Sequence, residues 1–141
     1  MAEYLTHGPA ETEALAASLA AKAPAGAVIA LFGDLGAGKT AFARGYVRGR
    51  GIEAEVSSPT FALVNEYGAG NQKLYHFDMY RISGWEDLYS TGFFDYLDTG
   101  AQLLIEWSEN IEAALPPDCI RITIEKTPDP LARRITVIGA D

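Results

Sequence analysis

The sequence has little cysteine, and it has no long apolar run. Its single cysteine, Cys119, has no partner for an internal disulfide, so we expect a reducing, cytoplasmic environment. No apolar stretch approaches the roughly 20 residues that a membrane-spanning helix needs. The N-terminus lacks the basic start and apolar core of a secretory signal. We therefore expect neither secretion nor a membrane partner.

Basic charge is also scarce. The chain carries 11 Lys and Arg against 19 Asp and Glu, which gives a formal net charge of −8. Contacts to nucleic-acid phosphates need clustered Lys and Arg side chains. The composition therefore predicts a poor independent binder of nucleic acid, to which a partner protein would have to contribute most of the positive surface.

The residue patterns predict one α/β domain that spans residues 1–141. Hydrophobic residues make up 48% of the chain, as in a globular protein. An Ala- and Leu-rich segment predicts a helix over 11–23, and the apolar run 27–32 predicts a strand that is covered on both faces. Helical periodicity returns over 39–50, and 85–89 is a short helix at most.

Strand patterns dominate the rest of the chain. Residues 61–67 and 73–77 flank a glycine-containing turn and predict a β-hairpin, and further strands are expected at 102–107, 119–125 and 133–138. The expected fold is a P-loop NTPase-like, mostly parallel sheet that is flanked by helices and carries an added antiparallel hairpin.

A complete G-x-x-x-x-G-K-[ST] motif lies between the predicted strand and the following helix. It reads Gly33, Asp34, Leu35, Gly36, Ala37, Gly38, Lys39, Thr40. Glycines let the backbone N–H groups of such a loop face phosphates, and the next helix adds the positive end of its dipole. The motif predicts that Lys39 reaches the β- and γ-phosphates of a nucleoside triphosphate and that Thr40 offers its hydroxyl to Mg²⁺.

Two apolar strands end in a carboxylate, and either carboxylate is a candidate for holding Mg²⁺ or its water shell. Asp78 follows 74–77, and Glu106 follows 103–105. A carboxylate in such a place can instead cap a helix or face solvent, and the sequence does not divide the roles of the two.

Three neighbouring residues carry weaker signals. Thr60 follows Pro59 and is a candidate switch residue whose hydroxyl would contact the γ-phosphate or the metal, although Ser-Pro-Thr is more often only a turn. His76 alternates with Asp78 along a strand and is favoured as a structural hydrogen-bonding residue over a base. Taken by itself, Trp107 is favoured as a core residue.

Several segments together resemble one family. They are the glycine-rich motif, residues 58–61 (Ser-Pro-Thr-Phe), residues 75–81 (Tyr-His-Phe-Asp-Met-Tyr-Arg) and residues 104–107 (Leu-Ile-Glu-Trp). In this order and spacing they resemble the bacterial TsaE family, also called YjeE. That family is the ATPase component of tRNA threonylcarbamoyladenosine synthesis, and the resemblance covers nearly the whole chain.

The resemblance implies binding of ATP with Mg²⁺ and slow hydrolysis by the chain alone. It implies that the partners TsaB and TsaD modify the adenosine next to the anticodon in tRNAs that read codons beginning with A, so that tRNA is met only through the complex. The resemblance implies that Thr40 and Glu106 hold Mg²⁺, that Asp78 and Thr60 serve hydrolysis or switching, and that Trp107 lies beside the site. Together with Lys39 of the motif, Asp78, Glu106 and Thr60 are the predicted catalytic residues, and Thr12 and Arg134 are predicted near the nucleotide. Thr12 corresponds to a position near the adenine, and the adjacent Arg133 leaves the match of Arg134 open.

Two other nucleotide-binding classes are alternatives. A small-molecule kinase also uses this loop, but 141 residues leave little room for a lid and an acceptor pocket. A small GTPase would need an Asn-Lys-x-Asp segment, and residues 71–74 (Asn-Gln-Lys-Leu) match it poorly. No arginine lies in the glycine-rich motif, and Arg81 is the nearest candidate for an internal arginine finger. The oligomeric state, the turnover rate and the step that hydrolysis drives do not follow from the sequence.

Overall fold

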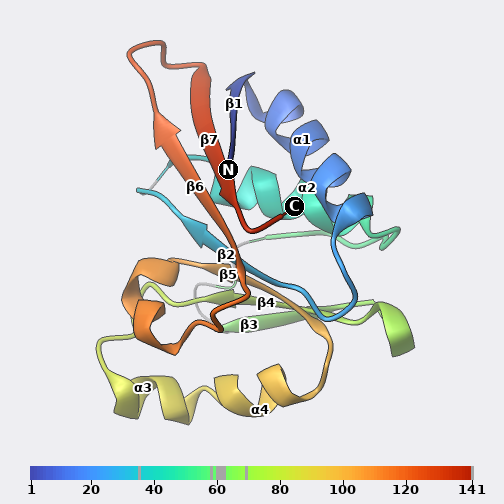
Figure 1. Cartoon of the computed structure of the whole chain (residues 1–141), viewed down its shortest axis with the longest axis vertical. Helices are drawn as coiled ribbons and strands as arrows, with labels where there is room; N and C mark the ends of the chain where they lie inside the picture. Colours follow the sequence, from blue (N-terminus) through green and yellow to red (C-terminus); the bar gives the residue numbers. More distant parts are fainter. Residues whose placement is uncertain (35, 58, 60–62, 69, 141) are drawn as a thin grey trace.

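The chain folds as a seven-stranded sheet with helices on both faces (Figure 1). The structure is a computed structural model that describes residues 1–34, 36–57, 59, 63–68 and 70–140. The strands are β1 (Ala2–His7), β2 (Val28–Phe32), β3 (Val64–Tyr67), β4 (Leu74–Asp78), β5 (Gln102–Glu106), β6 (Ile120–Lys126) and β7 (Ala132–Ile138). The helices are α1 (Pro9–Lys22), α2 (Lys39–Gly49), α3 (Trp85–Ser90) and α4 (Phe93–Asp98), with 3-10 segments η1 (Gly70–Gln72) and η2 (Ser108–Ala114).

The sheet is mixed. Its order is β1-β7-β6-β2-β5-β4-β3, and the four strands in the middle, β6, β2, β5 and β4, run parallel. Both ends of the sheet are antiparallel, because β3 pairs with β4, β7 with β6, and β1 with β7. The expected hairpin is therefore present as β3 and β4, while the sheet as a whole is less parallel than the sequence predicts.

Side chains of β5 separate the interior into two apolar layers. Leu104 packs in the layer that contains α1 and α2, while Leu103 and Ile105 pack in the layer that contains α3, α4 and η2. Figure 1 shows the two helix pairs on opposite sides of the sheet. β5 lies inside the sheet and has an apolar layer on each face, so its five residues are all buried, as the apolar run predicts.

Two glycines of α2 let it lie directly against α1. A Cβ added to Gly45 would be 2.2 Å from the carbonyl oxygen of Glu13, and one added to Gly49 would be 2.5 Å from that of Ala17. Both distances are far below a van der Waals contact, so larger residues cannot occupy these places without moving a backbone. This contact positions the N-terminus of α2, where the glycine-rich loop ends.

We expect Gly45→Ala to destabilise the fold by about 1–3 kcal/mol, because the added methyl group overpacks the contact between α1 and α2. Helix propensity alone predicts the opposite sign, since Ala is favoured over Gly in a helix by about 1 kcal/mol. Urea denaturation measures the change. Gly84→Ala adds the same methyl group at the N-cap of α3, where nothing lies within 4 Å of a Cβ, so it shows the cost of the substitution without a clash, which should not exceed about 1 kcal/mol. Increased stability of Gly45→Ala would contradict the close-packing account.

Candidate functional site

The glycine-rich loop joins the central strand β2 to the start of α2. Gly38 precedes the helix in a left-handed conformation with φ 110°, which residues with a side chain rarely adopt. Among the described residues, no side chain caps α2. The first N–H groups of an uncapped helix have no partner in the helix, so this N-terminus is suited to an anion.

Lys39 is buried beside the loop, with only 5% of its surface exposed. Its Nζ donates a hydrogen bond to the carbonyl oxygen of Gly33 at 2.5 Å and lies 3.3 Å from the centroid of the Trp107 ring. Trp107 adopts a left-handed backbone conformation with φ 58°, which is rare for a bulky residue and turns the chain after β5. The ring therefore lies at the loop and not only in the core.

Burial lowers the pKa of Lys39 from its ordinary value, because a charged amine loses solvation in the interior. Four carboxylates oppose this shift: in order of effect, those of Glu109, Glu106, Asp78 and Asp34. A buried cation surrounded by anions is the arrangement expected where a charged ligand is bound.

The two candidate carboxylates lie next to each other at the carboxyl ends of β4 and β5. Asp78 is the register partner of Glu106, and the two residues are 4% and 3% exposed. Asp78 Oδ1 accepts a hydrogen bond from the N–H of Tyr80 at 2.8 Å, and Glu106 Oε2 lies 2.6 Å from His76 Nε2. The structure thus brings both carboxylates, which the sequence placed only at strand ends, to one edge beside Lys39.

The donor set at this edge suits Mg²⁺. Thr40 is half-buried in the first turn of α2 and offers a hydroxyl, and Asp78 and Glu106 offer carboxylate oxygens. Within the described part of the chain, no group of three or more His, Cys, Asp or Glu side chains forms a preassembled metal cluster. Mg²⁺ fits such a sparse site, because it is commonly held by one or two carboxylates while substrate phosphates and water complete its shell.

Of the two neighbouring arginines, Arg133 is the one that contacts the loop. Its Nε donates to the carbonyl oxygen of Ala37 at 2.9 Å and its Nη2 to that of Gly36 at 3.4 Å. Arg134 instead forms an exposed ion pair with Glu125, with 3.5 Å between Nε and Oε1. Successive residues of a strand point to opposite faces, and β7 turns Arg133 toward the loop. The structure therefore brings Arg133, and not Arg134, to the site.

Glu109 also contacts the loop, although it lies outside every motif of the sequence. Its Oε2 accepts a hydrogen bond from the N–H of Gly33 at 2.9 Å. Glu109 lies in the short segment η2, where no helical periodicity marks a face. Its proximity to the loop depends on the turn at Trp107, which the sequence does not reveal.

Thr12 shares a hollow with the glycine-rich loop. The hollow has a volume of about 260 Å³, and its walls come from the loop, the start of α1 and the turn before β7. They include Gly8, Pro9, Thr12, Gly36, Ala37, Gly38, Ala41, Pro130, Leu131 and Arg133. Thr12 is itself buried, and its hydroxyl lies 2.8 Å from that of Thr6. The structure thus places Thr12 next to the loop, while its position near the adenine stays a prediction.

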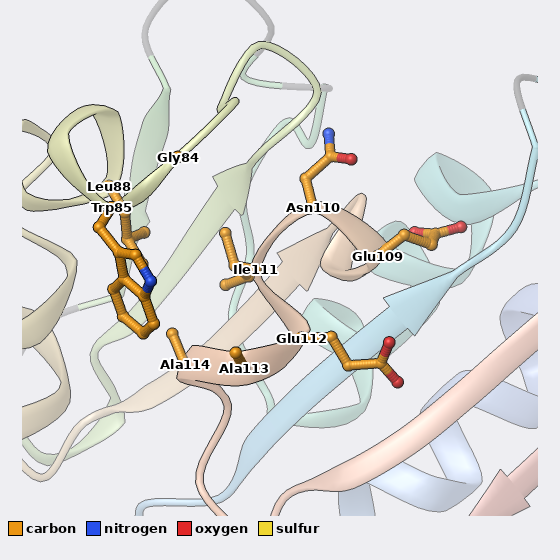
Figure 2. Close-up of a pocket in the computed structure, with 9 residues that line it drawn as sticks. All are labelled: Gly84, Trp85, Leu88, Glu109, Asn110, Ile111, Glu112, Ala113 and Ala114. Carbon is orange, nitrogen blue, oxygen red and sulfur yellow. The ribbon is translucent and has the colours of Figure 1, made fainter.

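A second hollow, of about 280 Å³, lies between α3 and η2. Figure 2 shows Trp85 on one side of it and Glu109 and Glu112 on the other. Glu109 therefore borders this hollow and also bonds the loop at Gly33. The second hollow contains no residue that the sequence predicts for the site.

Two predicted site residues, Leu35 and Thr60, lie outside the described residues. Asp34 is exposed on the loop and acts on Lys39 through its charge. The rest of the motif, Gly33 and residues 36–40, surrounds the N-terminus of α2.

Comparison with known proteins matches residues 6–135 to the profile of one family, "Threonylcarbamoyl adenosine biosynthesis protein TsaE". The chain is 42% identical over 128 residues to the tRNA threonylcarbamoyladenosine biosynthesis protein TsaE of Bacillus subtilis, which covers 90% of this chain and 79% of that protein. It is 43% identical over 112 residues to the protein of the same name from Haemophilus influenzae, with 79% and 70% covered. The crystal structure of YdiB from Bacillus subtilis superposes with a TM-score of 0.80 at 38% identity, covering 96% of this chain and 83% of that one.

The fold and site define an α/β protein with a seven-stranded mixed sheet, in which a glycine-rich loop leads into a helix beside two strand-end carboxylates. The family profile covers most of this architecture. The chain belongs to the TsaE family, as its resemblance predicted. None of the described helices is long and apolar enough to cross a bilayer.

We expect Arg133→Met to loosen the glycine-rich loop. The substitution removes charged donors from the carbonyl groups of Gly36 and Ala37, each such bond being worth about 1.5–3 kcal/mol. Amide hydrogen exchange at Ala37, whose N–H bonds the carbonyl oxygen of Asp34, should become about tenfold faster or more. Arg134→Met is the matched control, because an exposed ion pair contributes about 0–1 kcal/mol. Equal exchange in the two variants would contradict the assignment of Arg133.

Proposed function

We propose that this chain is a P-loop protein that binds ATP with Mg²⁺ and hydrolyses it slowly when alone. We propose further that it acts with TsaB and TsaD in forming the threonylcarbamoyl group on the adenosine next to the anticodon of tRNAs that read codons beginning with A. One observation carries the nucleotide assignment: the glycine-rich loop leads into the uncapped N-terminus of α2 beside buried Lys39. Family membership supports the tRNA pathway.

The residues of the site divide the work in this proposal. The N–H groups at the start of α2 and the amine of Lys39 receive the phosphates, and Trp107 keeps that amine in place. Asp78, Glu106 and Thr40 offer oxygen ligands to Mg²⁺, which when bound offsets negative charge on the phosphates. Thr60 is proposed for hydrolysis or switching on the strength of the resemblance. The hollow that Thr12 borders would receive the nucleoside.

Several contacts support a division of labour with partner proteins. Arg133, which contacts the loop, donates to its backbone carbonyl groups, and Arg81 stays only a candidate for an internal finger. A P-loop site that lacks an arginine finger is slower by about 10³–10⁵ than a completed one. The net charge of −8 favours basic protein surfaces and disfavours direct contact with tRNA. A soluble, cytoplasmic location is proposed on the same basis as the tRNA pathway.

We expect Lys39→Ala to weaken ATP binding by about ten- to a hundredfold or more, since a hydrogen bond to a charged group is worth about 1.5–3 kcal/mol. Calorimetric titration with a non-hydrolysable ATP analogue measures the affinity. Lys22→Ala removes an exposed lysine from the end of α1 and should leave the affinity unchanged. Unchanged affinity in Lys39→Ala would refute the nucleotide assignment.

We expect TsaB and TsaD together to raise the rate of ATP hydrolysis by this chain, and to do so less at high salt, because salt screens association between acidic and basic surfaces. Steady-state hydrolysis is measured for the chain alone and with the partners, at low and high salt. In parallel, the chain alone should bind tRNA weakly at physiological salt. A rate that the partners leave unchanged at every salt concentration, or tight binding of tRNA by the chain alone, would contradict the proposed division of labour.

A further inference from the structure

We propose that His76 is a positioning residue, which holds the Glu106 carboxylate in the orientation that Mg²⁺ requires. We propose also that Tyr67 connects this pair to Ser57, in the segment that follows α2. The inference rests on the proposed function, because it takes Glu106 as the metal ligand. It adds two residues, His76 and Tyr67, that the proposed chemistry itself does not use.

The first step is the contact between His76 and Glu106. His76 lies on β4 and Glu106 on the adjacent parallel strand β5. Only 2.6 Å separates Nε2 from Oε2, while the two residues are 0% and 3% exposed. Water cannot replace a bond in such a place, so the imidazole controls the orientation of the carboxylate more firmly than an exposed partner would.

The second step concerns what the contact does for a metal. An ionised carboxylate can only accept, through either of its two oxygens, so a bond at this distance requires the imidazole tautomer that carries its proton on Nε2. Fixing one oxygen removes rotational freedom from the other. Residues that orient metal ligands in this way commonly contribute ten- to a hundredfold to metal affinity. His76 therefore has a use beyond satisfying a buried polar group.

The third step extends the contact away from the sheet. His76 Nδ1 lies 3.4 Å from the hydroxyl of Tyr67, and the same hydroxyl lies 3.4 Å from the carbonyl oxygen of Ser57. Asn65 Nδ2 donates to both of those oxygens, at 3.3 Å each. The single hydroxyl proton of Tyr67 can go to only one acceptor, and in this proposal it goes to Nδ1 of His76. The path from Glu106 to Ser57 then runs through Asn65, whose two amide protons reach the oxygens of Tyr67 and Ser57.

Two amide substitutions at one position separate positioning from packing. In His76→Gln the amide nitrogen reaches the place of Nε2 and keeps a donor to Glu106. In His76→Asn the shorter side chain reaches only the place of Nδ1 and leaves Glu106 without that donor. Both variants replace a buried ring by an amide, but His76→Asn also leaves the buried carboxylate of Glu106 without its donor, so we expect the Asn variant to be the less stable of the two. Thermal unfolding checks this order and shows that both variants remain folded at the temperature of the binding measurement.

The readout is the dissociation constant of Mg²⁺, measured by calorimetry with the chain saturated by a non-hydrolysable ATP analogue. We expect His76→Asn to weaken Mg²⁺ binding by about ten- to a hundredfold and His76→Gln to retain most of the parent affinity. Affinity for the analogue in the presence of EDTA should be the same in all three proteins. Tyr67→Phe, which removes only the hydroxyl, should weaken Mg²⁺ binding less than His76→Asn does.

Equal Mg²⁺ affinity in the Asn and Gln variants, with analogue binding intact, would overturn the role of His76. Parent-like affinity in Tyr67→Phe would overturn the connection to Ser57. Failure of the parent chain to bind the analogue at all would refute the proposed function instead, so the two failures are distinguishable.

The parent chain also offers a test that needs neither metal nor a substitution at His76. The sequence contains two histidines, and His7 is exposed. In NMR spectra of protein labelled at histidine nitrogen, we expect one imidazole N–H proton that exchanges slowly with water and is lost or exchanges faster in Glu106→Ala, which removes the acceptor. Rapid exchange of both histidine ring protons in the parent would overturn the proposal even if the variants at His76 did not fold.

Discussion

Parallel pairing of β2, β5 and β4 is the constraint on which the rest of the site depends. These three strands run the same way, so their carboxyl ends meet at one edge of the sheet. β2 leads there into the glycine-rich loop, while β4 and β5 end there in Asp78 and Glu106, which are register partners. A slip of one residue between β4 and β5 would turn one carboxylate to the other face. The all-buried side chains of both strands oppose such a slip.

The same edge brings opposite charges together in a protein that is strongly acidic overall. Burial disfavours the charged form of Lys39, and Asp34, Asp78, Glu106 and Glu109 compensate for it. In the proposed function an incoming polyphosphate meets these carboxylates as well as the amine. Mg²⁺ then has a physical role beyond ligation, since it separates the phosphate charges from those of the strand-end carboxylates. A nucleotide without the metal would meet uncompensated repulsion at this edge.

Local patterns were sufficient to predict the centre of the fold. The apolar run before the glycine-rich motif and the periodicity after it predict β2 and α2, and both are present. β1 was missed, because most of its side chains are exposed and it pairs only at the edge of the sheet. α4 and η2 were missed as well, since each is too short to show a periodic face. Missing β1 is one reason why the sheet is more antiparallel than the sequence predicts.

Within the site, the sequence predicts which residues are polar site residues better than it predicts which other residues they contact. His76 was predicted to be a hydrogen-bonding residue, but its bond to Glu106 depends on the register of β4 and β5. Arg133 and Arg134 are adjacent, and the sequence does not show which of them faces the loop. They point to opposite faces of β7, and the structure shows that Arg133 is the one that contacts the loop. Arg133 and Ala37 are 96 residues apart in the sequence, so no local sequence pattern indicates that they are in contact.

The contacts of Arg133 and Glu109 hold backbone groups in the described part of the glycine-rich loop. Arg133 bonds the carbonyl oxygens of Gly36 and Ala37, and Glu109 bonds the N–H of Gly33 at the other end of the loop. Carbonyl groups that are engaged by an arginine cannot turn toward an anion, so the N–H groups at the start of α2 remain the polar groups that face it. Holding the loop in this form before a ligand arrives reduces the ordering cost of binding. In the proposed function, two residues far from the motif in sequence thus prepare the loop for a phosphate group.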